Sequence, residues 1–294
     1  MINLIFLWLA LVPMYLPTST ETDILRATLD VSGQASAHLL DVSNINGSIQ
    51  VEGTTGKQII VEVRRTIKGD SPQAIAQGKE EIQLGTHQVP GFTALYMKTP
   101  CSAALPPGTD VAEYQKYTWK RWKDDCSLAQ GYDYQLDYTI KVPQATSLEV
   151  TTVNRGDLGV RSVRGKITAH NVNGDIAVED IQNRLNVRTV NGEVDLYYTG
   201  VPADGSSYYS LNGDITVWLA GDLNAEVFFE SYNGDLYLDS DRIQAMPTQV
   251  IKEEEVAGRG IKKSITARQG IQVGRGGPKL GFETFNGDVY LRKQ

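Results

Sequence analysis

The 294-residue chain has two cysteines, three histidines and no excess of basic residues. A structural zinc site needs about four Cys or His ligands, and His38, His87 and His170 have no paired spacing, so neither a metal nor a cofactor is predicted. With 28 Lys+Arg against 35 Asp+Glu, the net charge of −7 argues against a nucleic-acid partner. The G-x-S-x-G, H-E-x-x-H and P-loop motifs are also missing, which leaves the common hydrolase and nucleotide-binding classes without support.

Long hydrophobic runs are absent except at the N-terminus, where apolar residues extend from Ile2 to Leu16 and are interrupted by Pro13. This run is short for a membrane span of ~20 residues and is typical of a signal-peptide core. We therefore predict a signal peptide or an N-terminal anchor over residues 1–22. The protein is then exported to the periplasm, the cell surface or the medium, and it contacts a membrane only if the N-terminus is not cleaved.

Cys101 and Cys126 are the two cysteines. In an exported chain a pair is most simply a disulfide, which stabilises by roughly 3 kcal/mol in the loop-entropy model. Two free buried thiols are the alternative.

A nine-residue spacing runs through the middle of the chain. Gly156, Gly165, Gly174, Asn183 and Gly192 occupy the same place in five successive units. If this place is numbered five, positions three, seven and nine hold 14 apolar residues in 15, where a chain that is 41% hydrophobic would give about six. Apolar positions that recur so regularly face a core, so the units are structural repeats.

Side-chain parity separates two architectures for these repeats. In a meander of hairpins with two-residue Asn-Gly turns, positions three and six are cross-strand neighbours, and Asp175 would be buried beside Val172. Burying a row of carboxylates is costly. If the chain instead bends at Asn-Gly and continues, positions three, seven and nine point inward while six and eight point outward. The sequence therefore predicts an all-β fold, a parallel β-solenoid.

The charge at position six indicates the coil length. Asp157, Asp175 and Glu193 recur every 18 residues, with Lys166 and Arg184 between them, so two nine-residue sides form one coil. The Asn-Gly spacing lengthens to 21 residues at Gly213 and Gly234 and to 53 at Gly287, which predicts wider later coils and an insertion over residues 239–283 in the last. The predicted structural corners are Asn173, Gly174, Asp175, Asn191, Gly192, Asn212, Gly213, Asn233, Gly234, Asn286 and Gly287.

Two further regions are expected beside the leader at 1–22. Residues 23–143 form an N-terminal β region with an inserted aromatic and basic loop at 99–131, and residues 144–294 form the Asn-Gly-Asp solenoid, continuous with it. At most one short helix is expected, beginning after Ser71, where a capping serine is followed by proline.

The segments TVNGEVDL, SLNGDITVWL and SYNGDLYL and the ending GRGGPKLGFETFNGDVYLRKQ resemble the bacterial putative-adhesin family of unknown function, related to auto-transporter-adhesin head GIN domains. The resemblance covers most of the mature chain and implies an exported or envelope-associated β-solenoid with Asn-Gly-Asp corners. It implies no catalytic residues. Arg155 shifts the first corner by one residue, Asn183 replaces a corner glycine, and the segment 101–126 is an insertion, so these three features depart from the family pattern.

The corners could be ligand sites or only turns. Stacked coils would align Asp157, Asp175, Glu193, Asp214 and Asp235 in a carboxylate column. The paired glycines of calcium-binding nonapeptides are missing, so a solvated edge is favoured over a metal site. Asparagine tolerates left-handed backbone and can hydrogen-bond from coil to coil, which favours a structural role for the corners.

Aromatic and basic residues alternate in the segment EYQKYTWKRWKDDC. Aromatic side chains and arginine are typical interface anchors. The predicted binding residues are Tyr114, Tyr117, Trp119, Arg121 and Trp122. An aromatic clasp packed on the flank of the solenoid is the alternative.

The sequence thus favours a noncatalytic exported module, adhesin-like or structural, in the cell envelope. Its partner is unknown, with a glycan or an envelope protein as candidates. The alternatives are a polysaccharide-active β-helix enzyme, a lyase or glycosidase with acids converging near Asp157, Asp175 or Asp195, and an envelope stress or signalling partner protein.

Overall fold

The computed structural model describes residues 18–31, 35–102, 106, 109–117, 127–247, 249–257, 260–268 and 270–294. For residues 115–117, 249–257 and 260–268 it describes the backbone. Most of the predicted leader lies outside these ranges, but the first strand already begins at Ser19, inside the segment assigned to the leader. Within the described ranges, no helix is both long and apolar enough to cross a membrane.

Strands dominate the fold. Those of the N-terminal part are β1 (Ser19–Asp30), β2 (Leu39–Ser43), β3 (Ile49–Thr54), β4 (Gln58–Gly69), β5 (Gln83–Val89), β6 (Phe92–Lys98) and β7 (Tyr132–Pro143). Those of the repeats are β8 (Ser147–Thr152), β9 (Leu158–Arg161), β10 (Ile167–Asn171), β11 (Ile176–Ile181), β12 (Leu185–Asn191), β13 (Val194–Tyr198), β14 (Ser206–Asn212), β15 (Ile215–Leu219), β16 (Ala225–Asn233) and β17 (Leu236–Leu238). The remainder are β18 (Ile243–Ala245), β19 (Gln249–Ala257), β20 (Gly260–Arg268), β21 (Gly270–Val273), β22 (Lys279–Asn286) and β23 (Val289–Lys293). The helices are α1 (Pro72–Glu81), α2 (Val111–Tyr117) and the 3-10 turn η1 (Ala35–Ala37).

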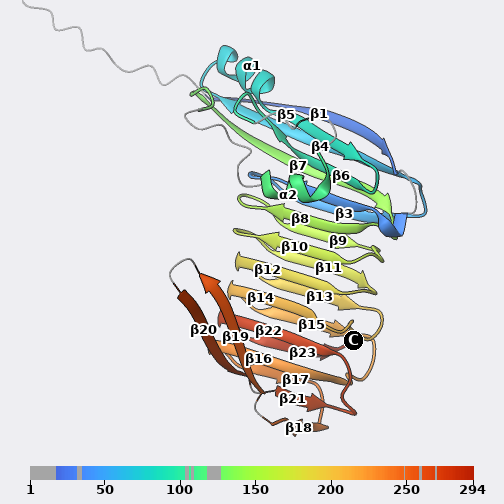
Figure 1. Ribbon diagram of the computed structural model, residues 1–294. Coiled ribbons are helices and arrows are strands. Elements are labelled where there is room, and N and C mark those ends of the chain that lie inside the picture. The colour runs from blue at the N-terminus through green and yellow to red at the C-terminus, as the bar shows by residue number, and fades with distance from the viewer. Residues whose placement is uncertain are drawn as a thin grey trace, which may run out of the picture.

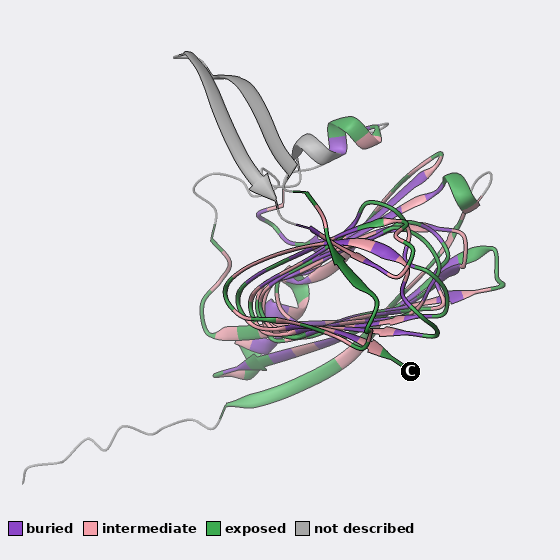
Figure 2. Ribbon diagram, turned by 90° about the horizontal axis from the view of Figure 1, so that it is seen from below, coloured by how far each residue is buried: buried purple, intermediate pink, exposed green. Residues whose placement is uncertain are grey.

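Two large sheets form the two sides of a flattened coil (Figure 1). Sheet A has the order β1-β4-β7-β3-β9-β11-β13-β15-β23-β17, and sheet B has the order β18-β21-β16-β22-β14-β12-β10-β8-β2-β6-β5. Strands β19 and β20 form a separate antiparallel hairpin. Viewed along the stack in Figure 2, successive coils superimpose as a flattened ring.

The strands between Ser147 and Leu219 pair only in parallel, as side-chain parity predicts. Ile176 of β11 lies opposite Leu158 of β9 and Val194 of β13. Positions seven and nine of the repeat are buried in every unit, and each fully buried aliphatic side chain contributes about 1.5–3 kcal/mol. The meander alternative is therefore excluded for this part of the chain.

Position three of the repeat departs from the prediction. Val163 and Ile181 are buried, but Val172 and Val190 are only half-buried beside the Asn-Gly corners. At these corners the inward residue is the polar one before them, Asn171 or Thr189. Thr189 Oγ1 donates to the carbonyl oxygen of Gly174 (3.3 Å), and Asn171 Nδ2 donates to that of Gly156 (3.1 Å). Each corner therefore holds a buried polar side chain that satisfies a glycine carbonyl.

The order of the coils also differs from the prediction. We expected the coil at Asn286 to follow the coil at Asn233, with residues 239–283 as its insertion. Instead, β22 lies between β14 and β16, and β23 lies between β15 and β17. The last coil of the chain is thus the next-to-last coil of the stack.

Two α-helices form among the described residues, where at most one was expected. The first, α1, begins after Ser71, whose side chain accepts a hydrogen bond from the Ala74 amide, as predicted. The second, α2, lies inside the predicted aromatic loop, and Asp110 Oδ1 accepts from the Glu113 amide at its start (2.8 Å). An acidic cap of this kind favours a helix that the aromatic pattern had obscured.

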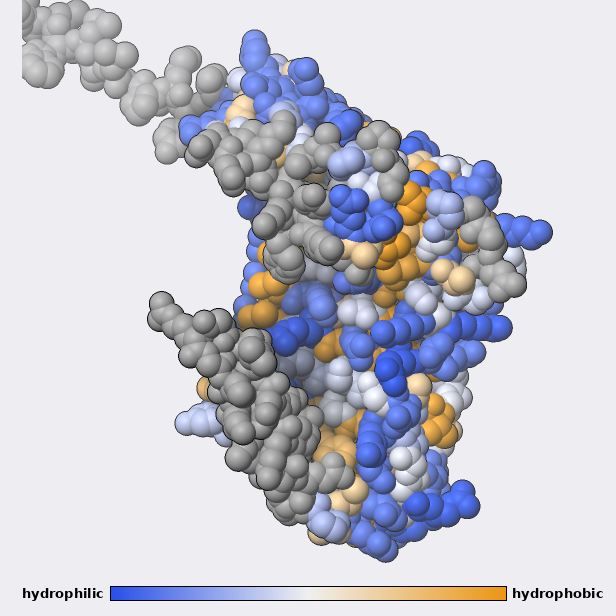
Figure 3. Space-filling view, viewed as in Figure 1, coloured by the Kyte–Doolittle hydropathy of each residue, from blue (hydrophilic) through white to orange (hydrophobic). Residues whose placement is uncertain are grey.

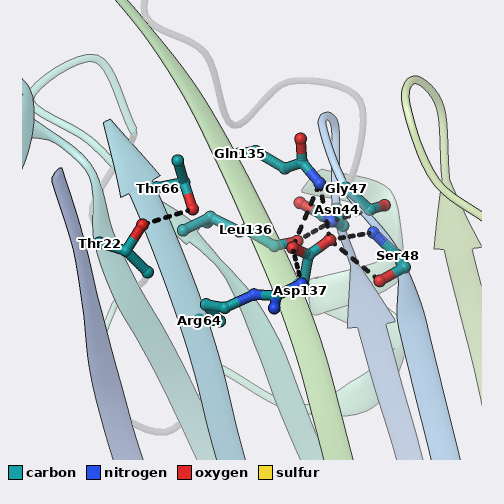
Figure 4. Close-up of polar contacts among 9 residues, drawn as sticks. All are labelled: Thr22, Asn44, Gly47, Ser48, Arg64, Thr66, Gln135, Leu136 and Asp137. Carbon is teal, nitrogen blue, oxygen red and sulfur yellow. Dashed lines mark hydrogen bonds and ion pairs between the residues drawn. The ribbon is translucent and has the colours of Figure 1, made fainter. Parts of the chain in front are cut away.

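A further Asn-Gly corner, at Asn46 and Gly47 before β3, shows how the turns are held (Figure 4). Asn44 Nδ2 donates to the carbonyl oxygens of Gly47 (3.0 Å) and Leu136 (2.8 Å). Asp137 Oδ1 accepts from both the amide and the hydroxyl of Ser48 (3.0 Å each). Burial acts to raise the pKa of Asp137, but hydrogen bonds, chiefly from the Ser48 amide, outweigh it and lower that pKa.

Replacing Gly213 by alanine should lower the free energy of unfolding by about 3 kcal/mol. Gly213 has a φ of +139°, and a Cβ there would overlap the carbonyl oxygen of Gly192 on the neighbouring coil. Urea unfolding measures the loss. Gly200→Ala is the matched control, since a Cβ at that position meets nothing within 4 Å. Equal losses in the two variants would contradict a requirement for glycine at the corner.

Asp137→Ala should lower the free energy of unfolding at neutral pH by about 1–3 kcal/mol, because it removes hydrogen bonds to a carboxylate. Folding lowers the pKa of Asp137 from its ordinary value of 3.8. The ionised carboxylate therefore contributes fully to the free energy of unfolding above pH 3.8, and this contribution is lost as the pH falls through the pKa of the folded state. Urea unfolding from neutral to acid pH should show the gap between wild type and variant narrowing. A gap that stays constant, or one matched by the exposed control Asp241→Ala, would refute this role.

Candidate binding site

The predicted aromatic site lies mostly outside the described residues. This holds for Trp119, Arg121, Trp122 and the side chain of Tyr117. Tyr114 is described and is fully buried, with its ring 4.9 Å from that of Phe92 and its hydroxyl donating to Asp41 Oδ1 (3.1 Å). Assigning Tyr114 to an exposed binding surface was therefore wrong, because its side chain anchors α2 on the core.

The predicted disulfide falls partly in the same region. Cys101 is fully buried, and Cys126 lies outside the described residues, so their pairing stays a prediction.

The corner asparagines form a continuous ladder along one edge of the stack. Asn191 Nδ2 donates to Asn173 Oδ1 (2.8 Å), and Asn191 Oδ1 accepts from Asn212 (2.9 Å). The ladder extends from Asn154 at one end to Asn233 at the other. None of these asparagines has the left-handed backbone that the sequence allowed for. Among the described residues other than glycine, a positive φ occurs at Arg155, Ser162 and Asp180. The asparagines thus act through their side-chain amides.

The carboxylate column is also engaged in holding the corners. Asp157 Oδ1 accepts from the Asp175 amide (3.0 Å), and Asp175 Oδ1 accepts from the Glu193 amide (2.8 Å). Further along the stack, the Asp235 amide donates in the same way to Asp288 Oδ1 (2.9 Å). Among the described residues no group of acids, histidines or cysteines is arranged to hold a metal ion. These carboxylate-to-amide hydrogen bonds give the column a structural role at the corners.

Asp195, the other acid considered for catalysis, lies on the outer face of sheet A. Burial and the neighbouring Asp175 raise its pKa. Aromatic rings on the same face stack on one another: Tyr197 on Trp218 (6.2 Å) and Tyr237 on Tyr290 (5.0 Å). Because these rings contact each other face to face, less of their area is available to a ligand.

The outer face of sheet B carries a groove of about 370 Å³ across β10, β12, β14, β22 and β16. Asn186 and Ser207 line it, with Ser207 Oγ donating to Asn186 Oδ1 (3.1 Å). Gly281, the next residue in this row, leaves open space where other residues would place a side chain. Phe228 lines the groove beyond Gly281. The missing side chain at Gly281 thus deepens the face where it meets Phe228.

A second row of side chains gives the groove its charge. Parallel register places Arg188 beside His170 on one strand and beside Tyr209 on the other, and the Arg188 guanidinium lies over the Tyr209 ring at 4.1 Å. Burial lowers the pKa of His170, with Glu149 opposing and Arg188 adding to that shift. Glu283 and Glu230 continue the row beyond Tyr209. Arg188 therefore gives one part of the groove a positive charge, and Glu283 and Glu230 make the other end acidic.

Sequence reasoning did not find this groove. Its residues occupy the outward positions of strands on five different coils, so they are dispersed over residues 168–283. The sequence did contain one signal for it: when the coils are aligned, His170, Arg188 and Tyr209 occupy matching outward positions on successive coils.

Elsewhere, hydrophobic residues on the visible face gather in small patches among hydrophilic ones (Figure 3).

Comparison with known proteins identifies the fold family. No protein of curated function matches the chain. A crystal structure of a putative cell adhesion protein from Clostridium sporogenes shares 12% identity over 94% of this chain and 100% of the other, with a TM-score of 0.42. One of a putative adhesin from Bacteroides fragilis shares 13% identity over 92% and 97%, with a TM-score of 0.36. The sequence profile that matches residues 119–271 is that of the Toastrack DUF4097 family, and the chain belongs to this family.

Proposed function

We propose that the protein is a noncatalytic, exported, adhesin-like module of the cell envelope that holds an extended glycan in the sheet B groove. The groove is the observation that carries the proposal. It crosses five neighbouring strands and so extends for roughly 19 Å along the stack. A site of this shape suits a linear chain better than a compact ligand.

The chemistry of the groove matches that of a sugar. Phe228 supplies aromatic surface for the apolar face of a sugar ring, and Tyr209 supports the Arg188 guanidinium that lies over its ring. Asn186 and Ser207 supply amide and hydroxyl groups for the hydroxyls of the sugar. Arg188 can donate two parallel hydrogen bonds to a carboxylate. Export is supported by the apolar N-terminal run from Ile2 to Leu16.

A glycan array should show binding to wild type that falls at least about tenfold in Arg188→Ala and Tyr209→Ala, the variants that remove the central anchors. The matched controls are Arg161→Ala and Tyr237→Ala on sheet A, which should bind as wild type does. Circular dichroism should confirm that all four variants are folded.

The same array separates the groove from the aromatic loop. Trp119→Ala and Trp122→Ala should leave binding unchanged if the groove is the site. Loss of binding in these two variants alone would place the site in the loop instead. If the wild-type protein bound no glycan on the array, the proposal would be wrong.

A catalytic function is the second candidate, favoured by one feature. Glu230 and Glu283 lie opposite each other on β16 and β22 within the groove, and paired carboxylates are the catalytic groups of glycosidases. Incubation with a panel of neutral and acidic polysaccharides should yield neither new reducing ends nor unsaturated products. Products that form with wild type and are lost in Glu283→Gln would establish an enzyme instead.

A further inference from the structure

The two ends of the stack are covered differently. At one end, α1 packs on the core through Ile75, and Ile82 directly after it is fully buried. At the other end, among the described residues, the inward side chains of Phe229, Leu236 and Leu238 are only half-buried, whereas positions seven and nine are buried in every other coil. A solenoid needs a capping element at each end to keep its core out of water.

The two sheets also end at different levels. The last coil of the stack consists of β16 in sheet B and β17 in sheet A. Sheet A ends there, whereas sheet B continues with β21 and β18, which we call the ledge (Figure 1). Register aligns Ile271 and Ala245 of the ledge with the inward Val227 of β16, and Ile243 with the inward Ala225. Because Ile243 and Ala245 are exposed, the ledge turns an apolar face toward the side on which sheet A has already ended.

Within the described part of the chain, β17 is the last strand of sheet A and pairs on one edge only. The backbones of Asp235 and Asp239 hydrogen-bond to β23 (2.9 and 3.0 Å). The backbone groups of a paired strand point alternately to its two edges. Those of Leu236 and Leu238 therefore point to the free edge.

The outer edge of β18 is in the same state, since β18 is the last described strand of sheet B. The backbones of Arg242 and Met246 hydrogen-bond to β21 and the turn after it (2.8 and 2.9 Å). The backbone groups of Ile243 and Ala245 therefore point to the free edge. A free edge of this kind is a template for pairing with another chain.

A second copy related by a two-fold axis parallel to the strands fits this end of the stack. Such an axis exchanges the two sheets, so the ledge of each copy extends sheet A of the other. Two antiparallel pairings make β18 run parallel to β16, and β17 runs the opposite way on the other side of the flattened coil (Figure 2). In this arrangement β17 of one copy pairs antiparallel with β18 of the second copy.

The register of this pairing follows from the free backbone groups and from the side-chain faces. Leu238 lies opposite Ile243 of the second copy, and Leu236 lies opposite Ala245. All four residues have backbone groups at a free edge, and all four side chains point inward. Hydrogen bonding and apolar packing therefore select the same register.

Charge agrees with this register. It places Asp239, directly after β17, opposite Arg242 of the second copy, directly before β18. Opposite charges across a strand pair are stabilising. We propose that the protein forms a two-fold dimer through this end of the stack, with β17 of each copy paired to β18 of the other. The apolar faces of the two ledges then pack on each other, and the dimer does not depend on the glycan groove.

Sedimentation of the full-length protein should show a concentration-dependent dimer. Ile243→Lys should raise its Kd at least about tenfold, because a lysine on an edge strand opposes pairing. Ile60→Lys on β4 is the matched control, since Ile60 is 47% exposed and Ile243 is 43% exposed, and it should dimerise as wild type does. Circular dichroism should show that both variants are folded. Dimerisation of Ile243→Lys at the wild-type Kd would contradict the proposal.

A disulfide between two single variants tests the register. Tyr237 and Gln244 are both exposed and form a non-hydrogen-bonded pair in the proposed dimer, where Cα atoms lie about 4.5 Å apart, within the range of a disulfide. Full-length Tyr237→Cys and Gln244→Cys should be mixed and oxidised. We expect a covalent heterodimer in which mass spectrometry identifies a peptide linking positions 237 and 244, distinct from any bond of Cys101 or Cys126.

Two results would overturn the dimer. One is a bond that forms only between two copies of position 237, which would mean that sheet A pairs with sheet A. The other is a protein that stays monomeric at its highest soluble concentration and gives no bond between positions 237 and 244.

Discussion

The close approach of glycine to glycine at the corners is the constraint on which this fold depends. Each corner glycine lies so near the carbonyl oxygen of the next coil that a Cβ would overlap it, from Gly47 through Gly192 to Gly234. This approach allows coils to stack in parallel at the ordinary strand spacing while the chain turns sharply. The asparagine ladder, the carboxylate-to-amide bonds and the buried hydroxyls then satisfy the polar groups that the corner brings together.

Stacking through a shared corner does not depend on the order of coils along the chain. The coil at Asn286 lies between those at Asn212 and Asn233 and bonds to both through its corner asparagine, although it follows neither of them directly in the chain. The outward side chains on the strands, in contrast, lie on the face opposite to the shared core. In this way the groove of Arg188, Tyr209 and Phe228 forms on a scaffold whose stability comes from the opposite side of each strand.

Much of the repeat region was predictable because its nine-residue period recurs in residues that face the core. The parallel pairing and the inward positions seven and nine follow from parity and the cost of burying acids such as Asp175. The inward role of Thr189 was not predictable from hydrophobicity, since a buried hydroxyl looks like a surface residue until its carbonyl partner is known. The place of β22 and β23 in the stack was hidden for a different reason: their Asn-Gly corner has the same sequence as the corners of the other coils, so the spacing of the corners alone does not give the order of the coils. The groove was missed because it is assembled from five coils.

Amide hydrogen exchange at the corners measures the stacking most directly. The amides of Gly174, Gly192 and Gly213 donate to the carbonyls of Asn191, Asn212 and Asn286 on neighbouring coils (2.9–3.0 Å). Although these corners are at the surface, their amides should exchange as slowly as those in the middle of β12 and β14. Exchange at the rate of an open turn would contradict a stack held together at its corners.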